Sequence, residues 1–139
     1  MEKISKRILC IDDENLTLET VELILTKAGY YVQTSLSGKN VFDQIKSFQP
    51  DLILLDIVLA DEDGRDICRN IKNNPSTKTI PVIILSAHPE VFQTIIDNCA
   101  NDVVSKPFEI DQLLFRIERQ LKQVSSFNNT FYNSDEMTG

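Results

Sequence analysis

Long apolar runs and a cysteine framework are both missing from this sequence of 139 residues. No apolar run approaches the roughly 20 residues that a membrane-spanning helix needs, so we expect no membrane association. Residues 1–7 lack the apolar core of a signal peptide. The three cysteines, Cys10, Cys68 and Cys99, are an odd number and lie in apolar segments. We interpret them as small buried side chains of a cytoplasmic protein, with no disulfide or metal role.

Basic residues are also scarce: the sequence has 14 Lys and Arg against 21 Asp and Glu, which gives a net charge of −7. This balance argues against nucleic acid as a direct partner and suits divalent cations or basic protein surfaces. The lone histidine, His88, has no ligand set around it, and we interpret it as a loop residue. With 42% hydrophobic and 25% charged residues, the composition is that of one ordinary globular domain.

Two apolar segments end in acidic residues. Residues 52–55 are four consecutive apolar residues followed by Asp56, and residues 8–11 are followed by Asp12 and Asp13. Such continuous apolar runs are typical of parallel strands buried on both faces. Because buried carboxylates are costly, these acids are expected at the carboxyl edge of the sheet, where ligands bind in open α/β folds. If the two strands are neighbours, at least three carboxylates converge there and require a cation between them.

Strand and helix patterns alternate along the rest of the chain. The expected strands cover residues 8–11, 31–34, 52–55, 81–86 and 102–105. The apolar residues of the expected helices fall within 18–28, 41–48, 67–71, 91–99 and 110–124. This alternation predicts an α/β fold with a doubly wound, five-stranded parallel sheet in the order 2-1-3-4-5 and helices on both faces. The domain is expected over 1–124, and 125–139 is expected to be a disordered tail or linker stump.

Further polar residues follow the other strands at the same predicted edge. Ser86 ends the fourth strand, and Lys106 follows the fifth. Three acids can hold Mg²⁺, which prefers oxygen ligands, while a hydroxyl and an ammonium suit the oxygens of a phosphoryl group. A carboxylate can also act as the nucleophile in phosphoryl transfer. The sequence therefore predicts a magnesium-dependent phosphoryl-transfer site.

These residues, in this order and on these strands, resemble the receiver domain of bacterial response regulators. The resemblance covers about residues 7 to 124 and rests on Asp12-Asp13, Asp56, Ser86-Ala87 and Lys106-Pro107. It implies that a sensor histidine kinase or phosphotransfer protein passes a phosphoryl group to Asp56, which then controls binding to a downstream protein target or output domain. It also implies that Mg²⁺ is held by Asp12, Asp13, Asp56 and the backbone carbonyl of Val58. By the same resemblance, the phosphoryl group is contacted by Ser86, the backbone of Ala87 and Lys106, and the peptide bond before Pro107 is cis.

Some positions depart from the family pattern. Val103 stands where the family usually has an aromatic switch residue, so we expect small shifts in place of a large side-chain swing. Asp102 and Arg116 have the spacing of an intersubunit ion pair in one dimerising branch, which leaves a weak phosphorylation-dependent dimer open. Gln112 stands where that branch usually has an acid, so we favour an intrachain surface pair worth about 0–1 kcal/mol.

Other interpretations of the same residues stay open at this point. Asp12 or Asp13 alone could cap a helix, and Lys106 alone could be a solvated lysine. We expect no enzyme beyond self-catalysed phosphotransfer and dephosphorylation. The alternatives are a Mg²⁺-dependent phosphohydrolase that uses an aspartyl phosphate, or a receiver-like interaction module that is never phosphorylated. Haloacid-dehalogenase-like phosphatases have Asp-x-Asp after the first strand, whereas Asp12 and Asp13 are adjacent here.

Overall fold

The computed structural model describes residues 5–60, 62–88 and 99–122. In chain order the elements are β1 (Arg7–Ile11), α1 (Asn15–Lys27), β2 (Tyr31–Ser35), α2 (Val41–Phe48), β3 (Leu52–Leu55), α3 (Gly64–Asn73), β4 (Val82–Ser86) and β5 (Asp102–Ser105). A further helix covers residues 110–122. The helix expected around 91–99 falls almost entirely on residues 89–98, and the expected tail on 125–139; both lie outside the described part of the chain.

The described strands form one parallel sheet in the order β2-β1-β3-β4-β5, which confirms the predicted topology. The most apolar strands are central, as the sequence indicated, and the more polar β2 lies at an edge. All four residues of β3 are buried. Since burying one large apolar side chain contributes about 1.5–3 kcal/mol, this strand anchors the middle of the sheet.

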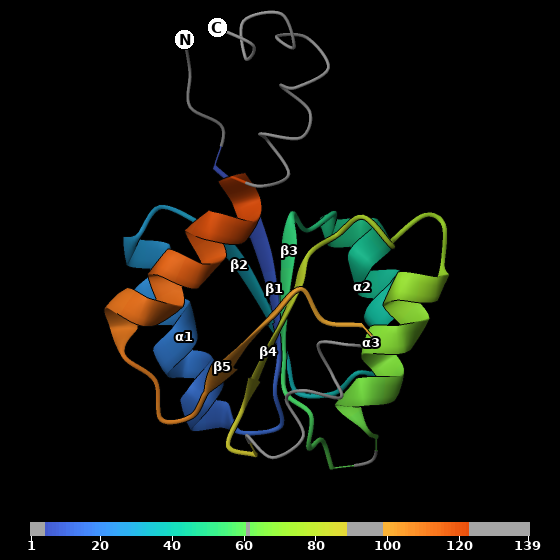
Figure 1. Ribbon diagram of the computed structural model, residues 1–139, viewed down its shortest axis with the longest axis horizontal. Coiled ribbons are helices and arrows are strands. Elements are labelled where there is room, and N and C mark those ends of the chain that lie inside the picture. The colour runs from blue at the N-terminus through green and yellow to red at the C-terminus, as the bar shows by residue number, and fades with distance from the viewer. Residues whose placement is uncertain (1–4, 61, 89–98, 123–139) are drawn as a thin grey trace, which may run out of the picture.

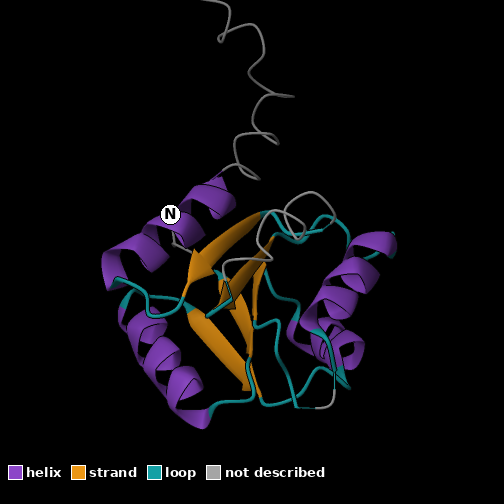
Figure 2. Ribbon diagram, turned by 60° about the horizontal axis from the view of Figure 1, so that its bottom comes forward, coloured by secondary structure: helices purple, strands orange, loops and turns teal. Residues whose placement is uncertain are grey.

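Helices cover both faces of the sheet, as predicted. Figure 1 shows α1 and helix 110–122 on one side of the strands and α2 and α3 on the other, and Figure 2 shows the strands enclosed between these layers. Alternate residues of each strand serve the two faces: Leu9 and Ile11 pack toward α2 and α3, whereas Ile8 and Cys10 pack toward α1 and helix 110–122. Among the described residues, the helices thus pack on the two faces of the sheet.

The helix ends follow local sequence signals. Gly29, with a φ of 99°, follows α1 in the left-handed region that glycine tolerates. Gln49 ends α2 with a φ of 53°, directly before Pro50. Asp63 caps α3, because its side chain accepts a hydrogen bond from the backbone N–H of Arg65.

Four residues that the sequence placed among the buried apolar side chains are not buried. Ala28, Phe42 and Ile110 belong to the apolar residues of the expected helices, but all three are exposed, Phe42 to 38% and Ile110 to 53%. Cys99 is only half-buried, whereas Cys10 and Cys68 are buried as predicted. Each of these side chains lies at the margin of a helix stripe or in a turn, where spacing alone does not determine burial. Among the described helices, none is long and apolar enough to cross a bilayer.

Candidate functional site

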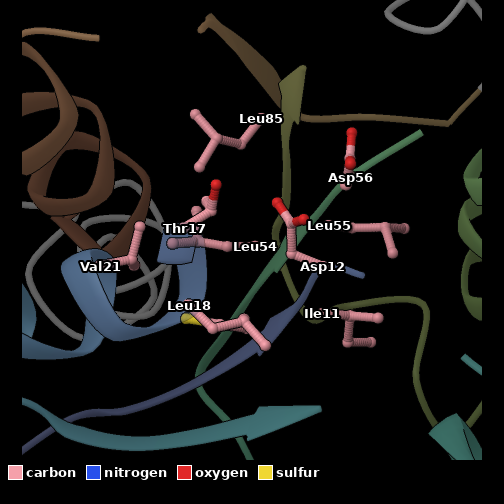
Figure 3. A pocket seen from close by; sticks show the side chains of 10 residues that line it. Ile11, Asp12, Thr17, Leu18, Val21, Leu54, Leu55, Asp56 and Leu85 are labelled. Carbon is pink, nitrogen blue, oxygen red and sulfur yellow. The ribbon is translucent and has the colours of Figure 1, made fainter. Parts of the chain in front are cut away.

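The neighbouring strands β1 and β3 end at the same edge of the sheet, and acidic residues follow both. The backbone N–H of Asp56 donates to the carbonyl of Ile11 (3.0 Å), and the N–H of Asp12 donates to the carbonyl of Ser35 (3.0 Å). The first contact holds the ends of β3 and β1 level with each other. Figure 3 shows the carboxylates of Asp12 and Asp56 at these strand ends.

The three carboxylates form a ligand set suitable for a metal ion. Asp12, Asp13 and Asp56 each offer an oxygen, and these oxygens lie within 4.8 Å of one another. Asp12 and Asp56 are buried, while Asp13 is exposed to solvent. An all-oxygen set that is open on one side fits Mg²⁺, which keeps several waters and binds through a few carboxylates.

Lys106 extends into this acidic cluster from the end of β5. Its Nζ lies 2.6 Å from Asp12 Oδ2, 3.5 Å from Asp56 Oδ2 and 3.7 Å from Glu14 Oε1. Its backbone N–H donates to the carbonyl of Ser86 (2.9 Å), which fixes the base of the side chain beside β4. The peptide bond between Lys106 and Pro107 is cis. The ammonium is thus hydrogen-bonded to Asp12 and within reach of Asp56.

Burial and charge both act on the ionisable groups of this cluster. Burial raises the pKa of Asp56; the Lys106 ammonium opposes this and the Asp12 carboxylate adds to it, and the pKa stays above its usual value. For Lys106, burial lowers the pKa, but the hydrogen bond to Asp12 and the surrounding acids outweigh it and the pKa rises. Lys106 therefore stays charged at neutral pH and partly offsets the crowding of carboxylates.

The floor beneath the carboxylates is apolar. A cavity of about 10 Å³ lies between α1 and the strand ends. Apart from Asp12, Asp56 and Thr17, its lining consists of Cys10, Ile11, Leu18, Val21, Leu54, Leu55 and Leu85. Figure 3 shows Leu18, Leu54 and Leu55 among the side chains around the two acids. Burial at this strand end is the largest cause of the raised pKa of Asp56.

The loop after Asp56 folds back, so that its far end contacts the backbone of Ile57 and Val58. The N–H of Gly64 donates to the carbonyl of Ile57 (2.7 Å), and Val58 forms a bridge with Asp63. The approach is so close that a Cβ at Gly64 would lie 2.1 Å from the carbonyl oxygen of Asp56. Only glycine fits between α3 and this backbone. The side chain of Val58, the residue expected to offer a carbonyl to the metal, is exposed.

The residues expected to contact the phosphoryl group lie at the next strand end. Ser86 is fully buried, and its Oγ accepts the backbone N–H of His88 (3.2 Å). Ala87 follows it and is exposed. Val103 pairs in register with Ile84 and packs, partly buried, against the core cluster on the α3 side. The structure thus brings the acids and Lys106 into contact, while Ser86 bonds to its own loop.

The start of α1 differs from the alternative in which Asp12 or Asp13 caps this helix. The N-cap of α1 is Glu14, not Asp12 or Asp13, and Asp12 Oδ1 accepts the Glu14 N–H (2.9 Å). Glu14, near Lys106, and Thr17, in the cavity wall, were not assigned to the site from the sequence. Their spacing, two and five residues after Asp12 at the start of a helix, is the signal that could have indicated them.

Asp102 and Arg116 form an intrachain ion pair, as we favoured. Arg116 Nη1 lies 2.8 Å from Asp102 Oδ1, and this oxygen also accepts the backbone N–H of Val103 (2.9 Å). The Asp102 side chain is only 10% exposed. The pair is therefore less solvated than the surface pair that we expected.

With this geometry in place, comparison with known proteins identifies the family. Residues 8–118 match the profile of the response regulator receiver domain. The chain therefore belongs to the response regulator receiver family. The fold, the strand order and the acidic edge all agree with this assignment.

Individual relatives support the same family. The chain is 36% identical over 119 residues to the response regulator ArlR of Staphylococcus aureus, a match that covers 84% of this chain and 53% of ArlR. It is 34% identical over 119 residues to the DNA-binding dual master transcriptional regulator RpaA of a Synechocystis strain, covering 84% of this chain and 49% of RpaA. The crystal structure of a putative response regulator from Chloroflexus aurantiacus superposes with a TM-score of 0.81 at 32% identity, over 86% of this chain and 99% of that one. The chain thus spans about half the length of the curated relatives that it matches.

Proposed function

We propose that this chain is a phosphoryl acceptor that takes a phosphoryl group onto Asp56 and signals by changing which proteins it binds. The observation that supports this most directly is the position of Asp56, buried at the end of the central strand with two further acids and one ammonium around it. In the reaction, an Asp56 carboxylate oxygen attacks phosphorus, and the bond between phosphorus and the imidazole nitrogen of a phosphohistidine breaks. Water later attacks the aspartyl phosphate, which restores the carboxylate and releases inorganic phosphate.

Asp12, Asp13 and Asp56 would hold Mg²⁺ in this reaction, with the Val58 carbonyl as a further ligand. The convergence of their oxygens within 4.8 Å supports this set. The ion would supply positive charge to the phosphoryl oxygens. The apolar floor keeps water from the inner side of Asp56, so the carboxylate faces its donor only from the open edge of the sheet.

Lys106 would add a further positive charge within the acidic cluster. Its Nζ already lies 3.5 Å from Asp56 Oδ2, so a small shift from Asp12 would let it pair with an added phosphoryl oxygen. The Ser86 hydroxyl and the backbone of Ala87 would contact the same group. Ser86 would first release its bond to the His88 N–H.

The partners follow from the chemistry and from the length of the relatives. The donor would be a sensor histidine kinase or a phosphotransfer protein, and the receiver of the signal a downstream protein or an output domain. RpaA, one of the longer relatives, is a DNA-binding regulator by name. For the described domain itself we propose protein contacts and no direct contact with nucleic acid, because the chain carries a net charge of −7.

The test is labelling with a small phosphoryl donor. Acetyl phosphate with Mg²⁺ should add one phosphoryl group to the intact mass, and the Asp56→Asn variant should gain none. The matched control is Asp43→Asn, which removes an exposed aspartate on α2 and should label like the wild type. Removal of the divalent cation by a chelator should stop labelling, because the crowded carboxylates then repel the anionic donor. Full labelling of Asp56→Asn would overturn the assignment.

The same experiment separates the two alternative functions. A phosphohydrolase would release inorganic phosphate from free phosphate esters, whereas the proposed acceptor takes its group from an activated donor such as acetyl phosphate and carries at most one group at a time. An interaction module that is never phosphorylated would show no mass change while Asp12, Asp13 and Asp56 remain intact.

A further inference from the structure

One acidic residue beside Lys106 lies outside the proposed metal set. Three carboxylate oxygens lie close to the Lys106 ammonium, at distances of 2.6 Å for Asp12 Oδ2, 3.5 Å for Asp56 Oδ2 and 3.7 Å for Glu14 Oε1. Asp12 and Asp56 belong, with Asp13, to the group of acids whose oxygens converge. Glu14 is not part of that group. Its carboxylate therefore faces the ammonium without being a ligand of the proposed ion.

The Glu14 carboxylate is held in place by two contacts at the start of α1. The Glu14 backbone N–H donates to Asp12 Oδ1 (2.9 Å), and its Oε1 accepts a hydrogen bond from the Thr17 hydroxyl (2.9 Å). This is the same Oε1 that lies nearest to the Lys106 ammonium. Glu14 is also the N-cap of α1, where the helix dipole favours a negative charge. A charged acceptor thus stands at the rim of the acidic cluster.

Mg²⁺ and the ammonium would compete for the same oxygens. Lys106 donates to Asp12 Oδ2, and Asp12 is one of the residues proposed to hold the ion. Two cations that share a carboxylate repel each other, and the flexible stem of a lysine lets its ammonium move. Of the three acids that the described residues place beside the ammonium, the proposed metal set leaves only Glu14 free.

We propose that Glu14 is a positioning residue that becomes the main counter-ion of Lys106 when Mg²⁺ binds, and so keeps the ammonium at the acidic edge for an arriving phosphoryl group. This inference rests on the proposed function, from which it takes the metal ligands. Glu14 contacts neither the ion nor phosphorus and acts through Lys106. An ion pair that is equally strong before and after Mg²⁺ binding could not change the affinity. The pair with Glu14 strengthens on binding, because Asp12 and Asp56 then turn to the ion, and it therefore favours binding.

The expected effect is small, because the Glu14 side chain is 65% exposed. Exposed ion pairs contribute little, so Glu14→Gln should weaken Mg²⁺ binding by about two- to five-fold. Loss of this charge also weakens its direct attraction for the divalent ion, whether or not Lys106 is present. A double-mutant cycle with Lys106 separates the two effects, since only the effect that passes through Lys106 depends on the ammonium.

The experiment compares the wild-type chain, Glu14→Gln, Lys106→Met and the double variant. Mg²⁺ is added in steps at an ionic strength of about 0.15 M, and amide chemical shifts report both binding and the fold. The loss of affinity caused by Glu14→Gln should be at least about twice as large with Lys106 as with methionine at that position. Glu19→Gln is the matched control, because it removes an exposed acid of the same helix. Its Mg²⁺ affinity should match that of the wild type within about 1.5-fold.

Equal losses from Glu14→Gln in the two backgrounds would overturn the inference, because Glu14 would then act on the ion directly. An equal loss in Glu19→Gln would also overturn it, because net charge alone would then explain the effect. If the wild type binds Mg²⁺ and fails either comparison, this inference falls alone and the assignment of Asp56 stands. A wild-type chain that binds no Mg²⁺ would overturn the proposed metal set and this inference with it.

Discussion

Replacing Gly64 by alanine would drive a methyl group into the backbone that carries Asp56. The added Cβ would lie 2.1 Å from the Asp56 carbonyl oxygen and 2.7 Å from the Ile57 Cα. Heavy atoms that are not bonded do not approach much closer than about 3 Å, so α3 and the strand end must separate by roughly 1 Å. Both clashing atoms belong to backbone and cannot rotate away. The separation would also lengthen the 2.7 Å hydrogen bond from the Gly64 N–H to the Ile57 carbonyl.

The expected size of this effect follows from overpacking and from misplacement of the nucleophile. Overpacking in a well-packed region costs about 1–3 kcal/mol, which corresponds to a fall in Tm of roughly 3–10 °C for a domain of this size. Because a displacement of about 1 Å can cost up to ~100-fold in rate, labelling of Asp56 by acetyl phosphate should slow by about 10-fold or more. Thermal unfolding and a time course of intact mass measure the two quantities.

Gly38→Ala is the matched control for this substitution. Its Cβ would lie 2.2 Å from Ile67 Cδ1, the far end of a flexible side chain that can rotate away. The free energy of unfolding should fall by less than about 1 kcal/mol, and the labelling rate should stay close to that of the wild type. A Gly64→Ala variant with the Tm and labelling rate of the wild type would refute this argument, as would equal losses in both variants.

Two further substitutions test the charged contacts. Lys106→Ala should still fold and become labelled. In the wild type, beryllofluoride, which mimics the phosphoryl group on Asp56, should shift the amide signals of β5 and helix 110–122. In the variant, these shifts should be lost. Wild-type shifts confined to the acidic pocket, or unchanged shifts in the variant, would contradict this route. Arg116→Ala should lower the free energy of unfolding in urea by about 1–3 kcal/mol, because it leaves the buried Asp102 carboxylate without its cation. A change below about 0.3 kcal/mol would show that water replaces the guanidinium at no cost.

The sheet was predictable because continuous apolar runs and terminal acids occur together in this sequence. The runs before Asp12 and Asp56 mark buried parallel strands, and strand order follows from placing the most apolar strands centrally. Helix ends were predictable where Gly29 and Pro50 act locally. Exposure at helix margins was not, because helical spacing does not say how far the contact with the sheet extends; Phe42 and Ile110 satisfy the spacing and are nevertheless exposed.

The position of the candidate site was also predictable, whereas its internal contacts were not. Strand ends place Asp12, Asp56 and Lys106 at one edge, but the choice of Asp12 as the hydrogen-bond partner of Lys106 depends on side-chain rotamers.

The ion pair between Lys106 and Asp12 joins residues 94 positions apart, at the ends of β5 and β1. If a phosphoryl group on Asp56 draws the ammonium away from Asp12, thermodynamic reciprocity applies between phosphorylation of Asp56 and binding of a partner on the β5 side. Any protein that binds the β5 side better when Lys106 has moved must, by the same factor, favour the phosphorylated over the unphosphorylated chain. A coupling of about 1.4 kcal/mol would make that factor 10-fold. A downstream partner would then also set how much of the chain is phosphorylated at equilibrium, so the signal's target takes part in determining its strength.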